Sequence, residues 1–216
     1  TLSAQSRAGA GAPEVGVAGA AAINIAIVKT EAFLATGASL NANANNVTLT
    51  AANMVTATAL ATSKSEDGAK TGIGLSFALN IVPVTTRAEI EDTVALTGVR
   101  DLSLQATTTP TLTTKAEAGA GGDSFSLGGA VSLAIADIKT KSRIGLRTGT
   151  TTLTGVVSLK AYEDEGTNLV TADGAAAVSA LTCAAFVTLA ALVSVNTPAR
   201  ATASIRMTAT RFMLPP

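Results

Sequence analysis

Large apolar residues alternate with small ones over long stretches of the chain. In the clearest stretch, Ile73, Leu75, Phe77, Leu79 and Ile81 occupy every second position, and glycine, serine, alanine or asparagine stands between them. A period of two places successive side chains on opposite faces of a β-strand. Because both faces carry apolar or small residues, we expect such a strand to be covered on both sides.

Other stretches alternate apolar residues with polar ones. Segments 47–51 and 102–106 read Val-Thr-Leu-Thr-Ala and Leu-Ser-Leu-Gln-Ala, so that one face of each strand is apolar and the other is polar. We expect the polar face to meet water. A short element at 87–92 lies between the two kinds of stretch and alternates charged residues with Ala88 and Ile90.

These strand patterns recur about every 55 residues, which indicates internal repeats. Segment 47–51 is followed by 102–106 and 157–161, at two steps of 55 positions. Other matches lie 56 or 57 positions apart: 74–79 with 130–135, Ala134 with Ala190, Asn24 with Asn80, and Leu96 with Leu153. We therefore interpret residues 1–216 as a single repeat array, with approximate units 1–55, 56–110, 111–166 and 167–216.

Short alternating strands at a fixed spacing predict an all-β fold, and we expect a tandem-repeat β-solenoid of the parallel β-helix type. Stacked coils would place Asn24 above Asn80 and Ala78 near Ala134. A β-sandwich, or an array of small all-β hairpin domains, is the alternative fold for the same pattern. Segment 174–195 has no charge and the length of a transmembrane helix. It is in register with earlier strand segments, however, so we expect strands there and no membrane span.

Composition narrows the class of protein. Apolar residues make up 47% of the chain but aromatics only 3%, so the core is expected to contain small side chains that let backbones approach closely. Lysine and arginine together number 15, as do aspartate and glutamate. This balance argues against a nucleic-acid partner, because phosphate binding needs a basic surface. Cys183 is the single cysteine, so no intrachain disulfide can form.

The segment from Leu75 to Ala106 resembles repeats of very large bacterial surface proteins. It runs from a large apolar strand through Asn80 and the motif Thr-Thr-Arg-Ala-Glu-Ile-Glu-Asp to Leu-Thr-Gly and Asp-Leu-Ser-Leu-Gln-Ala. The similar proteins include filamentous-haemagglutinin-like and autotransporter-like adhesins, and the resemblance extends from Val15 to about Arg200. It implies an extracellular or cell-surface location and a structural or adhesive role in a stalk or fibre. No functional residue carries over with it.

The residues offer little catalytic chemistry. The chain has no histidine, which removes Ser-His and Cys-His nucleophile pairs. Cys183 lies in an apolar strand without a basic neighbour, and we expect it to be buried. Glu89 and Glu91 share one strand face beside Arg87, which indicates a solvated edge and not a glycosidase pair. We therefore predict no enzyme, no catalytic, cofactor-binding or metal-binding residue, and no cofactor.

Two surface features leave a binding module as the alternative function. Threonine runs at 107–109 and 150–152, and carboxylates such as those at 163–165, could recognise ice, glycan or calcium. The turn at 119–125 has a single degenerate likeness to a calcium-binding nonapeptide, and a plain glycine-rich turn is the simpler interpretation. Across units the apolar positions match better than the threonines do, which favours the structural role.

The expected partners are copies of the chain itself or adjacent repeats of a longer parent chain. Stacked coils end in strands with unpaired N–H and C=O groups, and neither 1–7 nor 200–207 has the pattern of a polar cap. The formal net charge of zero does not keep copies apart. We therefore expect association end to end or sheet to sheet, as in a filament.

Overall fold

The computed structural model describes the backbone of residues 1–65, 70–146, 154–163, 167–178, 183–195 and 201–204, and the side chains of 1–65, 70–146 and 154–162. Every element in these ranges is a β-strand: β1 (Leu2–Ala10), β2 (Val15–Ile25), β3 (Val28–Leu34), β4 (Ser39–Ser65), β5 (Thr71–Ile81), β6 (Val84–Ile90), β7 (Ala95–Gly122), β8 (Phe125–Ile144), β9 (Val157–Glu163), β10 (Thr167–Val178), β11 (Cys183–Val195) and β12 (Ala201–Ser204).

The all-β prediction is confirmed, and the pairings between the described strands are parallel. A hairpin pairs antiparallel strands, so an array of hairpin domains is not what these strands form. The described residues of segment 174–195, which has the length of a membrane helix, belong to β10 and β11. In the described part of the chain, no helix is long and apolar enough to cross a membrane.

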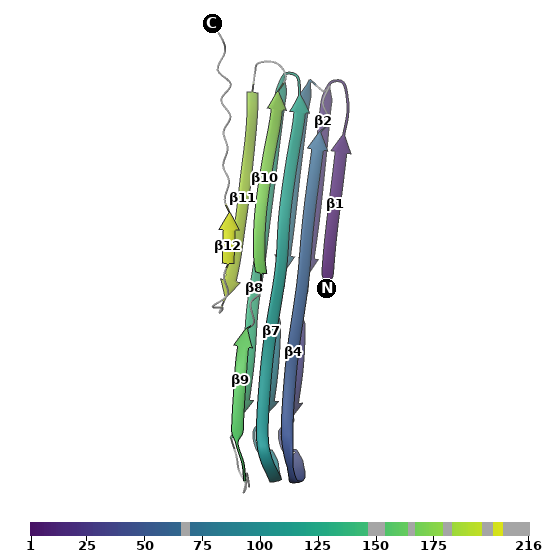
Figure 1. Cartoon of the computed structure of the whole chain (residues 1–216). Helices are drawn as coiled ribbons and strands as arrows, with labels where there is room; N and C mark the ends of the chain where they lie inside the picture. Colours follow the sequence, from purple (N-terminus) through teal and green to yellow (C-terminus); the bar gives the residue numbers. More distant parts are fainter. Residues whose placement is uncertain (66–69, 147–153, 164–166, 179–182, 196–200, 205–216) are drawn as a thin grey trace.

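The strands form two facing sheets (Figure 1). The first sheet has the order β1-β4-β7-β10-β12, with β9 alongside the first part of β7. In the second sheet, β2 and β3 pair with β5 and β6, which in turn pair with the two halves of β8, and β11 lies on the far side of β8. The chain runs along a strand of the first sheet and returns through the second, then repeats the circuit one strand further on.

Much of the predicted repeat register is confirmed. In the first sheet, segment 47–51 pairs with 102–106, which pairs with 157–161. In the second sheet, Asn24 pairs with Asn80. The predicted match of Leu96 with Leu153 lies outside the described residues, because it involves position 153.

The predicted register between β5 and β8 is wrong by two residues. Ala78 lies opposite Ser132, and Ala134 lies opposite Asn80. The next step is displaced as well, because Ala134 pairs with Leu192 and not with Ala190. A shift by two keeps the same side chains on the same face, so alternation alone does not distinguish the two registers.

The interior between the sheets changes in side-chain size along the strands. Toward one end the buried residues are small, and they include the alanines of a single cluster drawn from both sheets: Ala20, Ala22, Ala59, Ala61, Ala78, Ala116, Ala118, Ala130 and Ala134. Toward the other end, Ile90, Leu96, Leu102 and Leu104 fill the space between the sheets. The low aromatic content therefore corresponds to a thin core, as expected.

Two glycines of β5 mark a close approach of the two sheets. A Cβ at Gly74 would lie 2.9 Å from the carbonyl carbon of Gly119 in β7, and closer still to its oxygen. At Gly72 the corresponding distance to the carbonyl carbon of Gly121 would be 2.7 Å. The facing backbones leave no room for a side chain at either position.

Buried amide side chains connect the two sheets near the alanine cluster. Nδ2 of Asn24 donates to Oδ1 of Asn80 at 3.0 Å and to the carbonyl oxygen of Thr58 at 2.7 Å. Nδ2 of Asn80 donates to the carbonyl oxygen of Thr113 at 2.8 Å and to Oγ1 of Thr114 at 2.6 Å. These bonds satisfy polar groups that would otherwise be costly to bury.

The covered face of β5 is the opposite of the one that hydrophobicity suggests. Ala78 and Asn80 point into the interior and are fully buried, whereas Leu75 points outward and is 50% exposed. The expectation that the strand is covered on both sides is therefore wrong for the described chain. The prediction for the other kind of strand is confirmed, because Thr48 and Thr50 of β4 are exposed.

Candidate functional surfaces

The outer face of the second sheet carries an extended apolar surface over β2, β5 and the first half of β8. We call it the apolar face. Its residues occupy alternate positions on the three strands: Val15, Val17, Gly19, Ala21, Ile23 and Ile25; Thr71, Ile73, Leu75, Phe77, Leu79 and Ile81; and Phe125, Leu127, Gly129, Val131, Leu133 and Ile135. None is charged, and exposure reaches 58% at Val17 and 65% at Ile25.

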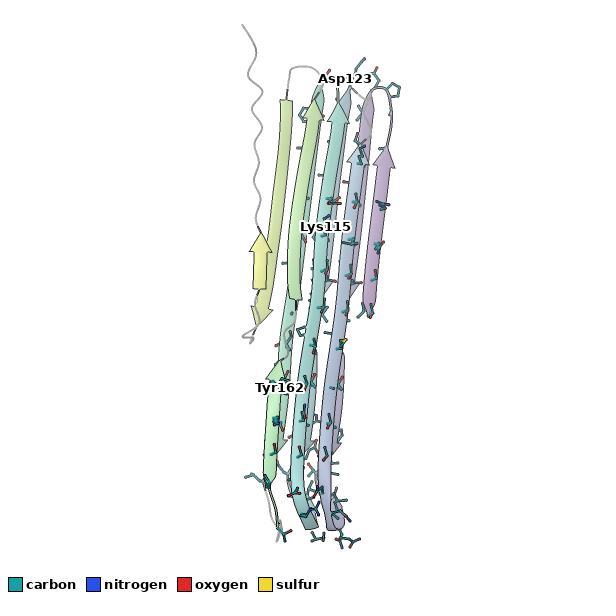
Figure 2. The ribbon with its side chains drawn as sticks, in the orientation of Figure 1. Lys115, Asp123 and Tyr162 are labelled. Atoms are coloured by element: carbon teal, nitrogen blue, oxygen red, sulfur yellow. The ribbon has the colours of Figure 1, made fainter. Side chains whose placement is uncertain are left out.

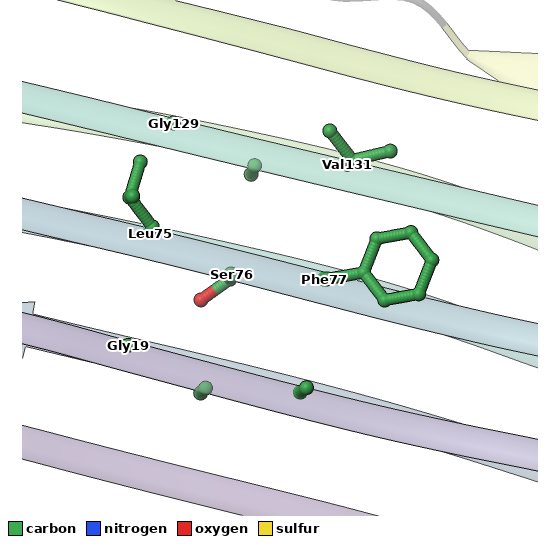
Figure 3. Close-up of a pocket in the computed structure, with 9 residues that line it drawn as sticks. Gly19, Leu75, Ser76, Phe77, Gly129 and Val131 are labelled. Carbon is green, nitrogen blue, oxygen red and sulfur yellow. The ribbon is translucent and has the colours of Figure 1, made fainter.

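The apolar face is not flat, because glycines interrupt its large side chains. Gly19 and Gly129 are the register partners of Leu75, one on each side. An open hollow of about 530 Å³ is lined by these three residues together with Phe77 and Val131 (Figure 3). A Cβ added at Gly19 would meet no atom within 4 Å. Leu75 is therefore a projection with a depression on each side.

A charged cluster occupies the outer face of the same sheet over β3, β6 and the second half of β8. Glu89 at its centre is only 2% exposed and receives hydrogen bonds from Arg143 and, at 3.2 Å, from Arg87. Arg87 also binds Glu31 at 2.8 Å and lies 4.6 Å from the ring centroid of Phe33. The cluster thus links residues of three neighbouring strands.

The environment of this cluster lowers the pKa of its carboxyl groups. Burial alone would raise the pKa of Glu89, but the hydrogen bonds from Arg143 and Arg87 and the charge of Lys141 outweigh burial, so the pKa lies below its usual value. The pKa of Glu91 is lowered mainly by hydrogen bonds from the backbone N–H and the hydroxyl of Thr36, with a contribution from Arg87.

These carboxylates are poorly placed for the glycosidase chemistry considered above. Glu89 and Glu91 do lie on one face beside Arg87, as the sequence predicts, and Arg87 bonds to both. The predicted solvated edge is wrong for Glu89, which is buried under the arginines of β6 and β8. The acid of a glycosidase needs a raised pKa so that it remains protonated. Both of these groups have lowered pKa values, so they are ionised at neutral pH and engaged with cations.

The outer face of the first sheet is polar (Figure 2). Two pairs of threonines lie in register there, Thr56 beside Thr111 and Thr58 beside Thr113. The next outward positions break the array, because Thr109 lies beside Met54, which is 79% exposed. On the described part of β4 and β7, a regular threonine array is therefore limited to a few side chains. The threonine run 150–152 lies outside the described residues.

The other candidate residues are placed only in part. In the glycine-rich turn, Asp123 lies between the end of β7 and the start of β8, and its position is labelled in Figure 2. Within the described residues, no group of three or more His, Cys, Asp or Glu side chains is arranged to hold a metal ion. Cys183 pairs through its backbone with Phe125, and its side chain and the carboxylates at 163–165 lie outside the described side chains. Burial of Cys183 stays a prediction.

No protein-family model, curated protein or solved structure matches the chain.

Proposed function

We propose that the chain is a structural or adhesive repeat segment of an extracellular bacterial surface protein or fibre, built as a flat β-solenoid. The observation that carries the proposal is the parallel stacking of successive units in both sheets. The chain makes one circuit through both sheets and then pairs with the previous circuit, at offsets of 55 residues in 47–51 and 56 residues in β2. Such coil-on-coil contact is the defining feature of a solenoid.

The pattern of agreement between stacked positions supports a structural role. Inside, Leu49 stacks on Leu104, Ala51 on Ala106 and Ala61 on Ala116, although Ala57 stacks on the larger Leu112. Outside, Thr50 stacks on Gln105, which stacks on Lys160, so the outer positions change from coil to coil. A ligand array would need its outer positions to repeat, whereas a scaffold needs only its interior to do so.

The dimensions favour a broad surface over a long thin stalk. The 27 residues of β4 extend about 90 Å at roughly 3.3 Å per residue. Each added coil of some 55 residues advances the stack by only about 4.8 Å, the spacing between neighbouring strands. A coil of this shape gains little reach and adds a wide strip of surface, which suits adhesion or the wall of a fibre.

Small-angle X-ray scattering of the dilute chain tests the architecture. An elongated particle of about 90 by 20 by 20 Å has a radius of gyration near 27 Å, whereas a compact 216-residue globule has one near 17 Å. Two copies joined head to tail provide a second test, because stacking thickens the particle and leaves its maximum dimension near 90 Å. A compact particle, or a maximum dimension that doubles in the joined copies, would contradict the proposal.

The location is tested separately, in cells that produce the parent protein. The resemblance to repeats of bacterial surface proteins supports an extracellular segment. Protease added to intact cells should then cleave the segment. Cleavage only after lysis would overturn the proposed location.

A further inference from the structure

The apolar face is one continuous patch over three paired strands, unlike the single exposed apolar residues that every protein has. The 11 residues of β2 extend about 36 Å, and three strands at about 4.8 Å span about 14 Å, so the face covers roughly 500 Å² in projection. The largest apolar patch of a typical monomer is about 300–600 Å², and such a patch often has a function.

The outward direction of these side chains is fixed by the packing of the two sheets. Turning β5 over would bring Ile73 and Leu75 toward β7, where Gly72 and Gly74 now touch its backbone and leave no room for a Cβ. At this end of the strands the interior therefore admits only small residues, and the large residues of β5 face outward. A partner outside the described chain is what can cover them.

A second copy of the chain has the area and the shape to do so. Two apolar faces packed together would hide about 1,000 Å² over three strands each, which is about the minimum area for a specific interface with good complementarity. The projecting Leu75 and the depressions at Gly19 and Gly129 lie on the same surface. A two-fold axis brings a projection on each copy to a depression on the other.

Charge does not oppose this contact. The apolar face has no charged residue, so pairing leaves no ion unpaired in the interface. The charged cluster around Arg87 and Glu89 lies toward the other end of the same sheet, beyond the apolar strands. Its side chains can keep their ion pairs and their contact with water when two apolar faces meet.

We propose that two copies of the chain pair face to face through the apolar face of the second sheet. The pairing rests on the proposed flat two-sheet architecture and adds the surface and the partner. Sheets packed in this way lie about 10 Å apart with interdigitating side chains. The contact is closed by its two-fold symmetry and yields a dimer, whereas edge-to-edge pairing of strands would yield an open series of larger species.

Sedimentation equilibrium of the full chain, from below one to tens of micromolar, tests the pairing. Wild type should be a dimer at the upper end. Leu75→Lys and Val17→Lys should each weaken dimerisation by about a hundredfold or more, because each places an ammonium group twice in a symmetric apolar contact. Met54→Lys is the matched control, since Met54 is exposed on the outer face of the first sheet, and it should dimerise like wild type.

Circular dichroism establishes that each variant is folded. Leu75 is half exposed, so a lysine there can reach water in the monomer, and Val17→Lys gives an independent reading should Leu75→Lys fail to fold. A wild-type chain that is monomeric at tens of micromolar overturns the pairing. So does a result in which Leu75→Lys, Val17→Lys and Met54→Lys all associate as strongly as wild type. A monomer that binds uncharged-surface phosphatidylcholine vesicles, and loses this binding in Leu75→Lys, assigns the face to lipid and also overturns the pairing. An elongated monomer in scattering would leave the proposed architecture intact.

Discussion

Replacing Gly74 with alanine should destabilise the fold strongly, although alanine suits a β-strand better than glycine does. The added Cβ would lie 2.9 Å from the carbonyl carbon of Gly119, and ordinary contact begins at 3.4 Å. The two backbones must therefore separate by at least 0.5 Å (3.4 − 2.9), and by more to clear the carbonyl oxygen. No flexible side chain can absorb this movement, because the opposing atoms belong to the backbone of β7.

The cost follows from moving one packed sheet against the other. Overpacking a closely packed interior costs about 1–3 kcal/mol, and a clash with backbone belongs at the upper end of that range. Alanine recovers about 0.5–1 kcal/mol relative to glycine within a strand. The net destabilisation of Gly74→Ala should therefore be about 2 kcal/mol.

Gly19→Ala is the matched control. Gly19 lies on the neighbouring strand of the same sheet but faces outward, where a new Cβ meets no atom within 4 Å. This substitution should leave stability unchanged or raise it by up to about 1 kcal/mol. Both substitutions are made in the Leu75→Lys background, so that self-association does not contribute to the comparison.

Urea denaturation followed by circular dichroism measures the difference. With a slope of about 2 kcal/mol/M, expected for a chain of this size, Gly74→Ala should lower the midpoint by about 1 M and Gly19→Ala should not lower it. If the two variants unfold at the same midpoint, the close approach of the sheets at Gly74 is wrong. The assignment of the small residues to the interior would then be wrong with it.

Two further substitutions test the buried amide and the charged cluster. Asn80→Ala removes hydrogen bonds to Thr113 and Thr114 and leaves Asn24 without one partner, so it should cost about 2–4 kcal/mol in the same urea assay; an unchanged midpoint would contradict the buried network. The pKa of Glu89 in the folded state lies below its usual value, so the unfolded state binds more protons as the pH falls. The contribution of the Glu89 carboxylate to stability is therefore complete above about pH 4.5 and is lost as the pH falls through the lower folded pKa. Glu89→Gln should cost about 1–2 kcal/mol at pH 7 and reduce the loss of stability between pH 5 and 3, and an identical pH profile would count against the cluster.

The sequence predicts the register of the first sheet better than that of the second, for a physical reason. Segments 47–51 and 102–106 carry leucines that face the interior, where the packed side chains must match in size. The alignment of these two segments is therefore distinctive. Apart from Asn80, the paired interior positions of β5 and β8 are alanine, glycine and serine, and a shift of two positions mostly exchanges one small residue for another. Uniformly small side chains specify the face of a strand without specifying its register.

The orientation of β5 could not be read from hydrophobicity. Burial of large apolar residues is the usual guide, and it places Leu75 and Phe77 inside. The deciding contact lies between Gly74 and Gly119, which are far apart in sequence and belong to different sheets. The partners of Glu89 were also predictable only in part. Arg87 lies beside Glu89 in the sequence of the strand, whereas Arg143 contacts Glu89 only because β6 pairs with β8.

The two open directions of the fold have different consequences for a longer array. Along the stack, an added coil pairs its backbone with the last one and thickens the particle by about 4.8 Å. Across the stack, the same coil adds roughly 170 Å² to the apolar face, from about 36 Å of strand at a spacing of about 4.8 Å. The proposed lateral pairing would strengthen with each repeat, because the contacts of one array form together once the first has formed. An interface near the lower limit for a specific contact over three strands would become strong in an array of ten. The outward apolar residues of one coil thus contribute most when many coils present them in line.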